Sequence, residues 1–220
     1  MLRLAVLVSG RGSNLRALID AVHGGRLRAE IVGVFSDRPE CNAIALATQH
    51  GIPAVALRAR DFASREAFDE ALFDRIDAVQ PDLIVCAGYI RIISDAAVQR
   101  FEGRMINVHP SLLPKYPGLD THARALAAGD REHGASVHLV IPALDAGPVL
   151  AQARVAVRPD DNAETLARRV LAREHPLLVQ SVAWLAERRV IVRGTEFHRG
   201  GQLLSRPLQL NDRDQLEDFP

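Results

Sequence analysis

The amino-acid sequence predicts an α/β fold, in which a single domain is built on an open, mostly parallel sheet with helices on both faces. Short apolar runs rich in branched residues alternate along the chain with segments whose apolar residues recur at helical spacing. With 48% hydrophobic and 25% charged residues, the composition is that of an ordinary globular protein. A chain of 220 residues can bury a sizeable core without metal or disulfide bonds, and we expect one large domain rather than two small ones.

The first half of the chain is expected to supply the parallel part of the sheet. Its opening run, 2–8, is apolar and branched, and it ends at Ser9 and Gly10, after which helical spacing begins. Further strands are expected at 30–36, 52–57, 82–88 and 104–110, and further helices near 41–50, 64–79 and 94–101. Regular alternation of strand and helix implies a parallel, twisted, Rossmann-like sheet that is covered on both sides.

The second half of the chain has a different pattern. A helix near 120–128 precedes two apolar runs, 134–141 and 148–157, which we expect to add antiparallel strands at the C-terminal side of the sheet. A long helix from about Asn162 to Glu187 carries an apolar stripe that faces the core.

These elements define one domain over residues 1–193. The remaining segment, 194–220, is polar, weakly patterned and acidic at its end. Because such terminal segments have few apolar positions to bury, we expect this C-terminal extension to be weakly structured or to form an interface.

Charge and cysteine content limit the classes of binding partner and the cellular compartment that we expect for this protein. Lys plus Arg number 27 and Asp plus Glu number 27, so no net field recruits nucleic acid, and an anionic ligand has to be held locally. Of the two cysteines, Cys86 lies inside an apolar run, which suggests a buried thiol in a reducing compartment. No signal peptide is recognisable, and no run approaches the roughly 18 apolar residues of a membrane span. We expect a cytoplasmic protein with small-molecule ligands and no membrane partner.

The turn after the first strand is a candidate phosphate site. Gly10, Gly12, Ser13 and Asn14 follow the strand and open a helix, so free backbone N–H groups at the helix start can face an anion. Glycine lets the backbone approach closely, and Arg11 adds a positive charge. The alternative reading is that these residues only form a turn and a helix cap.

A dinucleotide site is a second reading of the same turn. Gly10 and Gly12 match the start of G-x-G-x-x-G, and Asp37 closes the second strand where a ribose-binding acid would lie. The third glycine is replaced by Leu15, which would obstruct tight packing of the helix on the strand. A monophosphate is therefore favoured over a dinucleotide.

Polar residues end the fifth predicted strand. Asn107 and His109 are two residues apart, so their side chains project from the same face of the strand. The proline-rich loop that follows, 110–118, is stiff. Ligands of open α/β sheets collect beyond the carboxyl ends of the strands, which favours a functional role over a hydrogen-bonded amide and a structural imidazole.

Asp145 is a candidate partner for the imidazole. It lies in a loop bounded by glycine and proline, where its alternative role is turn formation. If the carboxylate lies near His109, it favours the imidazolium and raises the histidine pKa. This hypothesis predicts a charged hydrogen-bond donor near neutral pH.

Several motifs together carry a family resemblance. SGRGSN (9–14), CAGYIRIIS (86–94), NVHPSLLPKYPG (107–118), the Asp145 loop and REH (173–175) occur in order over roughly residues 2–190. In this the chain resembles the folate-dependent glycinamide ribonucleotide formyltransferases (phosphoribosylglycinamide formyltransferases) of the bacterial single-domain type. Members of that family transfer the formyl group of 10-formyltetrahydrofolate to the substrate amine in purine synthesis.

The resemblance implies roles for individual residues. It implies substrate phosphate at Gly12, Ser13 and Asn14, substrate ribose at Glu174, and catalysis by Asn107, His109 and Asp145. It implies folate contacts from Arg65, Ile90, Arg91, Ile92, Ile93, Asn107, Ile141, Pro142, Ala143, Leu144 and Asp145. The substrates are then glycinamide ribonucleotide and a reduced folate, no metal is expected, and the enzyme is a monomer or homodimer. Asp120 and Leu171 depart from the family pattern, which leaves the contacts at those positions open.

Four other functions compete with this one. A formyltetrahydrofolate hydrolase or a methionyl-tRNA formyltransferase is expected to carry an additional domain. A non-catalytic nucleotide-binding module has no use for the Asn107, His109 and Asp145 cluster. A metal hydrolase is disfavoured because His122, His133 and His138 do not form a metal-binding motif.

Overall fold

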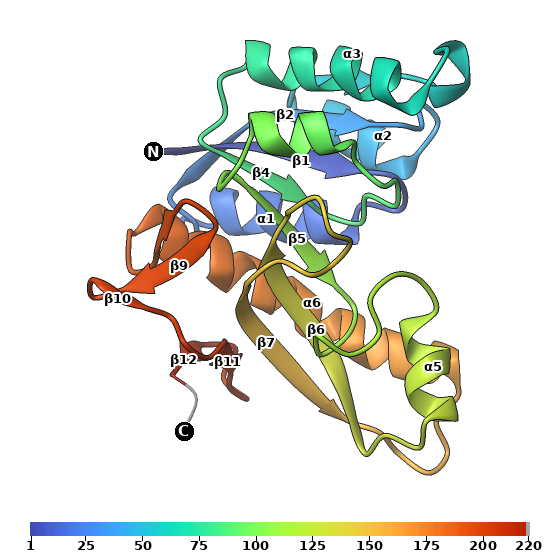
Figure 1. Cartoon of the computed structure of the whole chain (residues 1–220), viewed down its shortest axis with the longest axis vertical. Helices are drawn as coiled ribbons and strands as arrows, with labels where there is room; N and C mark the ends of the chain where they lie inside the picture. The colour runs from blue at the N-terminus through green and yellow to red at the C-terminus, as the bar shows by residue number, and fades with distance from the viewer. Residues whose placement is uncertain (219–220) are drawn as a thin grey trace.

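The computed structural model describes residues 1–218 and shows a central sheet with helices on both faces (Figure 1). Within these residues the main sheet has nine strands in the order β12-β11-β7-β6-β5-β4-β1-β2-β3. Strands from the first half of the chain pair in parallel, and antiparallel pairs follow toward the C-terminal side. This arrangement confirms the predicted fold class.

Five parallel strands form the N-terminal half of the sheet. They are β1 (Leu2–Val8), β2 (Ala29–Ser36), β3 (Ala54–Ala56), β4 (Leu83–Cys86) and β5 (Met105–His109), connected through α1 (Ser13–His23), α2 (Asn42–Gln49), the 3-10 turn η1 (Ala59–Asp61), α3 (Arg65–Ala78) and α4 (Asp95–Arg100). The chain runs outward from β1 to β3 and returns to β4 on the other side of β1. Such a reversal leaves a crevice at the carboxyl ends of the strands, where ligands bind in open α/β sheets.

The C-terminal half completes the sheet with strands of mixed direction. Its elements are α5 (Thr121–Ala127), β6 (Glu132–Leu139), β7 (Val149–Ala156) and α6 (Ala163–Ala186). Strand β6 pairs antiparallel with both β5 and β7. The predicted long helix is present, and the side chain of Asn162 caps it by accepting a hydrogen bond from the Thr165 N–H at 2.9 Å.

The C-terminal segment forms several short strands. They are β8 (Ile191–Arg193), β9 (Glu196–Arg199), β10 (Gln202–Leu203), β11 (Leu208–Leu210) and β12 (Leu216–Glu217). The first three make a separate antiparallel sheet, whereas β11 pairs in parallel with β7 and β12 pairs with β11. Leu208, Leu210 and Leu216 are buried. The strands described within 194–218 are two to four residues long, which is too short for an alternating pattern to be visible in the sequence.

The core lies on both faces of the sheet. On one face, α1, α2 and α6 pack their apolar residues against the strands, with Leu15, Leu46 and Leu178 among the buried side chains. On the other face, α3 and α4 contribute Phe68 and Val98. The strands are buried between the two helix layers, as expected for parallel strands with few polar residues.

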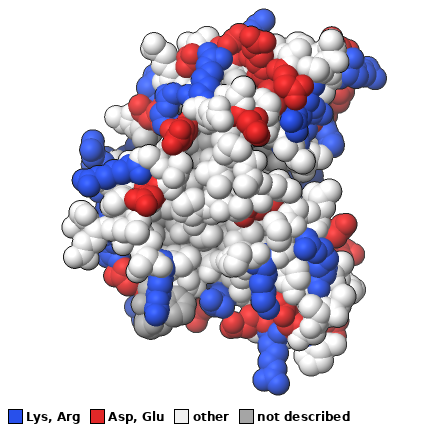
Figure 2. All heavy atoms as spheres, in the orientation of Figure 1, with Lys and Arg blue, Asp and Glu red and all other residues white. Residues whose placement is uncertain are grey.

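The surface carries mixed charge. On the face drawn in Figure 2, basic and acidic side chains are interspersed, including those over α3, and the middle of the face is mostly uncharged. Among residues 1–218, no helix is long and apolar enough to cross a lipid bilayer.

Candidate active site

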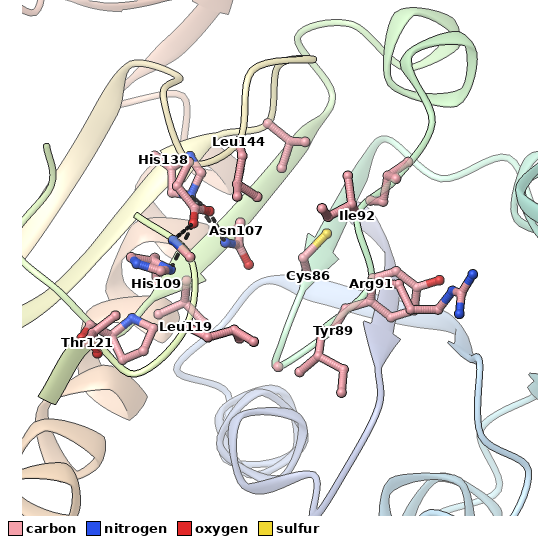
Figure 3. Close-up of a pocket in the computed structure, with 18 of the residues that line it drawn as sticks. Cys86, Tyr89, Arg91, Ile92, Asn107, His109, Leu119, Thr121, His138 and Leu144 are labelled. Atoms are coloured by element: carbon pink, nitrogen blue, oxygen red, sulfur yellow. Dashed lines mark hydrogen bonds and ion pairs between the residues drawn. The ribbon is translucent and has the colours of Figure 1, made fainter. Parts of the chain in front are cut away.

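A cavity of about 550 Å³ opens at the carboxyl ends of β4 and β5, next to the strand reversal. Its walls come mainly from the loops after these two strands and the loop between β6 and β7, with further side chains from α1, α4, α5, β6 and α6. In Figure 3, Asn107, His109 and His138 lie on one side of the cavity, and Cys86 and Ile92 lie on the other. The volume suits a small organic ligand.

The structure brings the three predicted catalytic residues together. Asn107 and His109 end β5, and Asp145 comes from the β6–β7 loop. His109 Nδ1 lies 3.4 Å from Asp145 Oδ2, and Asn107 Nδ2 lies 3.5 Å from Asp145 Oδ1. The Gly118 N–H donates to Asp145 Oδ2 at 2.8 Å, which fixes the carboxylate from the opposite loop.

Asp145 has an unusual backbone conformation. Its φ of 48° lies in the left-handed region, which aspartate adopts more readily than most residues but still at some cost. The adjoining loop is tight at Gly147, where a Cβ atom would lie 1.9 Å from the Leu139 carbonyl oxygen. The surrounding hydrogen bonds hold this conformation, and strained residues of this kind are concentrated at functional sites.

His138 is a fourth polar member of the cluster, which the sequence pattern did not predict. It is paired directly opposite Asn107 on β6 and is buried. Its Nδ1 donates to the Leu139 carbonyl at 2.8 Å, and its Nε2 lies 3.2 Å from Asn107 Nδ2 and 3.5 Å from Asp145 Oδ1. Neutral His138 therefore accepts from Asn107, and protonated His138 donates to Asp145.

The pKa of His109 corrects one sequence-based expectation. Burial lowers the pKa of His109, while the Tyr116 carbonyl and Asp145 raise it, and burial is the larger effect. The predicted effect of Asp145 is thus present, but the net pKa lies below the usual histidine value because the ring is only 5% exposed. The two nitrogens of this imidazole face acceptors, since Nε2 lies 2.9 Å from the Tyr116 carbonyl oxygen.

Asp145 remains ionised in this environment. Burial raises the pKa of Asp145, but the contact with His138 and the hydrogen bond from the Gly118 N–H lower it, and His109 lowers it further. The net pKa is below the usual aspartate value, so the carboxylate is charged at neutral pH.

The predicted phosphate turn begins α1 beside this cavity. Gly12 has a φ of 80°, and a Cβ atom there would lie 2.9 Å from Ala43 on α2, so only glycine fits. Asn14 lines the main cavity together with Glu174, and its Nδ2 donates to Glu174 Oε2 at 3.2 Å. Ser13 lies outside that lining and borders a neighbouring cavity of about 420 Å³ with Arg16.

Glu174 lies deep in the protein for a charged residue. Its side chain comes from α6 and reaches the start of α1, where Asn14 is its hydrogen-bond partner. Burial raises the pKa of Glu174, and the hydrogen bond from Asn14 only partly offsets this effect. A buried carboxyl group at the cavity wall is suited to bind hydroxyl groups of a sugar.

Most residues of the predicted folate set line the cavity. These are Ile90, Arg91, Ile92, Ile93, Asn107, Ile141, Pro142, Leu144 and Asp145. Ile90, Ile92 and Leu144 are 56%, 54% and 52% exposed, so this part of the wall offers apolar surface to a ligand. Arg65 and Ala143 do not line the cavity, and Arg65 forms an exposed ion pair with Glu66.

Further residues line the cavity without having been predicted from the sequence. They include Cys86, Tyr89, Leu119, Asp120, Thr121, His122 and His138. Burial raises the pKa of Cys86 to about 12, so this thiol is neutral at ordinary pH and is no nucleophile. Over residues 1–218, no group of three or more His, Cys, Asp or Glu side chains has the geometry to hold a metal ion.

Comparison with known proteins identifies the family. Residues 2–182 match the family model described as formyl transferase. The chain belongs to the formyl transferase family. It shares 44% identity over 189 residues with the phosphoribosylglycinamide formyltransferase of Escherichia coli K12, covering 86% of this chain and 89% of that protein. The phosphoribosylglycinamide formyltransferase of Haemophilus influenzae is 36% identical over 96% of this chain and 100% of its own length.

A solved structure agrees with this membership. The phosphoribosylglycinamide formyltransferase of Coxiella burnetii superposes with a TM-score of 0.87 at 44% identity, over 93% of this chain and 96% of that one. The formyl transferase described here is therefore an enzyme that transfers a one-carbon group, as the family resemblance implied. The cavity at the carboxyl ends of β4 and β5 is its candidate active site.

Proposed function

We propose that this formyl transferase moves the formyl group of 10-formyltetrahydrofolate to the amine of glycinamide ribonucleotide in de novo purine biosynthesis. One observation carries the proposal: a carboxamide, an imidazole and a carboxylate converge in a cavity between the start of α1 and an apolar loop. The high identity to phosphoribosylglycinamide formyltransferases supports the same reaction.

The two ends of the cavity suit the two substrates. The start of α1, where Asn14 lines the cavity and Gly12 and Ser13 lie next to it, would hold the phosphate of the ribonucleotide on free N–H groups. Glu174 would bind the ribose. The exposed apolar side chains of Ile90 and Ile92 would cover the pterin of the folate, together with the 141–145 loop. The amine and the formyl carbon then meet beside Asn107 and His109.

The reaction needs no protein nucleophile. The substrate amine attacks the formyl carbon and creates an oxyanion, which the Asn107 amide and a protonated His109 would stabilise. The amine loses a proton, and the folate nitrogen that leaves gains one. Asp145 would hold the imidazole and organise a water molecule for this proton transfer.

In this scheme the His109 ring takes up a proton from solvent as the oxyanion forms and releases it when the oxyanion collapses. Burial keeps the pKa of His109 below its usual value in the protein alone. A negative charge that forms close to the ring raises this pKa, so the oxyanion itself favours the imidazolium. To donate to the oxyanion, the ring has to exchange its contact with Tyr116 or Asp145.

An absorbance assay with glycinamide ribonucleotide and 10-formyltetrahydrofolate tests the proposed function. Release of tetrahydrofolate that depends on the amine substrate is expected. Equal release without glycinamide ribonucleotide would identify a hydrolase instead, and no release in either case would contradict the proposal. We further propose a cytoplasmic monomer or homodimer; sedimentation of the purified protein measures the number of subunits.

A further inference from the structure

Loop 88–94 forms the apolar wall of the active-site cavity, yet it has no regular secondary structure. Ile90 and Ile92 point their side chains outward from it and are more than half exposed. Ile93 and Tyr89 pack against the core. The exposed Ile90 and Ile92 gain little from burial, so we expect hydrogen bonds to hold the part of the loop that carries them. Two hydrogen-bond systems lie at its two ends.

The first system lies at Ile90. The Ile90 N–H donates to Ser9 Oγ at 3.2 Å, and the Ser9 hydroxyl donates to Asp37 Oδ1 at 2.7 Å. Ser9 is 2% exposed and the Asp37 side chain is 6% exposed, so the pair is shielded from water. Asp37 thus lies at the position of a dinucleotide-binding acid, but its carboxylate accepts a hydrogen bond from Ser9. The same Ser9 hydroxyl group accepts from the loop at Ile90.

The second system lies at Ser94, where the loop enters α4. The Ser94 N–H donates to Asp69 Oδ2 at 2.6 Å. Asp69 is on α3 and is fully buried, and its Oδ1 atom has no hydrogen-bond partner. An incompletely paired buried carboxylate is costly for stability, so its presence beneath the cavity wall calls for a functional reason.

Arg91 lies between these two points. Its guanidinium carbon is 4.8 Å from the centre of the Phe68 ring, the residue before Asp69. Burial raises the pKa of Asp69, and the hydrogen bonds from Ser94, followed by the positive charges of Arg91 and Arg65, partly offset this effect. The loop is therefore anchored to the β1 end on one side and to α3 on the other.

We infer that Asp69 and the Ser9–Asp37 pair are positioning residues that hold loop 88–94 in the shape in which it receives the folate substrate. The inference rests on the proposed function. A loop that is ordered before binding loses less conformational entropy when the ligand arrives. Loss of either anchor should therefore weaken folate binding and leave ribonucleotide binding at the other end of the cavity unchanged.

Four variants test this inference. Ser9→Ala and Asp69→Ala each remove one anchor, and Asp69→Asn keeps an oxygen that can accept from the Ser94 N–H. Asn162→Ala is the matched control, because it removes a helix cap on α6 and destabilises the protein without touching the loop. Ser9→Ala removes only one hydroxyl group, so it tests the first anchor even where Asp69→Ala does not fold.

Two measurements separate positioning from general destabilisation. Hydrogen exchange of the 88–94 amides in the protein alone should become faster in Ser9→Ala and Asp69→Ala. Calorimetry with tetrahydrofolate should show an affinity loss of about tenfold in both, which corresponds to about 1.4 kcal/mol. Asp69→Asn should recover most of the affinity. Glycinamide ribonucleotide affinity should change less than about twofold throughout, and Asn162→Ala should behave as wild type in both assays.

The outcomes are distinguishable. Unchanged amide exchange in Ser9→Ala and Asp69→Ala would overturn the inference, as would normal tetrahydrofolate affinity in both variants. An equal affinity loss in Asn162→Ala would also overturn it, because the effect would then be one of stability. Failure of the wild-type protein to bind tetrahydrofolate would contradict the proposed function itself, and the inference would fall with it.

Discussion

For single residues, the clearest example is His109, where burial and a neighbouring charge shift the pKa in opposite directions. The ring lies beside an ionised carboxylate, which raises its pKa, but it is also removed from water, which lowers the pKa more. The sequence could predict a carboxylate near the ring because Asp145 lies in a loop that is bounded by glycine and proline. It could not predict the degree of burial, which depends on how the loop 110–118 and strand β6 close around the ring.

The contribution of Asp145 to this balance can be measured. In Asp145→Asn the charge is lost, so the pKa of His109 should fall further below its wild-type value. Titration of the imidazole resonances by NMR measures the change. Asp74→Asn is the control, because Asp74 lies on α3 and pairs with Arg100. Equal His109 pKa values in wild type and Asp145→Asn would refute the electrostatic coupling.

The same two residues make a kinetic prediction. His109→Ala removes a donor to the oxyanion, and kcat should fall by on the order of 10²–10³ or more. Asp145→Asn should also lose most of kcat, while the KM for glycinamide ribonucleotide stays close to wild type in both. Steady-state kinetics measures both constants. His23→Ala, at the exposed end of α1, should be fully active, and normal turnover of either active-site variant would remove that residue from the mechanism.

At the scale of secondary-structure elements, the start of α1 is where sequence and structure agree most closely. The glycine turn after β1 is recognisable because Gly12 needs a positive φ and close contact with α2. The free N–H groups that follow are a property of any helix start. Their use as a phosphate site is a prediction that depends on Ser13 and Asn14.

A charge placed at this helix start tests the phosphate site. Ser13→Asp adds a negative charge where the substrate phosphate is expected, so the affinity for glycinamide ribonucleotide should fall at least about tenfold. Ser13→Ala removes the hydroxyl without adding charge and should lose less. Calorimetry with the ribonucleotide compares the two. Unchanged affinity in Ser13→Asp would argue against the site at the start of α1.

The strands show what the sequence could predict and what it could not. The main helices and strands were predictable because each is long enough for its periodicity to show, and both Asn107 and His109 line the cavity as their spacing indicated. His138 was not predictable as their neighbour, because its place opposite Asn107 depends on the register of β5 and β6. The short C-terminal strands lack a readable pattern, and β11 is ordered by tertiary contacts with β7, β12 and Arg173 on α6.

For the whole molecule, the burial of histidine side chains makes the free energy of unfolding depend on pH. His133 on β6 is 1% exposed, and its Nε2 lies 3.1 Å from His122 Nδ1. Burial, with a smaller contribution from the nearby His122, lowers the pKa of His133 to about 4. Burial also lowers the pKa of His109, His122 and His175, whereas it raises the pKa of Asp69 and Glu174.

These shifts have opposite signs for stability. Below about pH 6.5 the unfolded chain protonates His133 while the folded chain does not, so this residue destabilises the fold progressively as the pH falls toward about 4. The raised carboxyl pKa values act the other way, because the folded state then binds protons more readily than the unfolded one. The pH dependence of the free energy of unfolding of wild type therefore combines these opposing contributions. The difference in this pH dependence between wild type and a single-residue variant isolates the contribution of one residue.

His133→Gln removes the largest of the histidine contributions while keeping a polar side chain. The free energy of unfolding of wild type should decrease more steeply between pH 7 and pH 5 than that of His133→Gln, since only wild type carries the buried imidazole that resists protonation. Urea unfolding at several pH values measures both slopes. His23→Gln, which replaces an exposed histidine, should keep the wild-type slope. Parallel curves for wild type and His133→Gln would show that burial of this imidazole is not linked to the pH dependence of the fold.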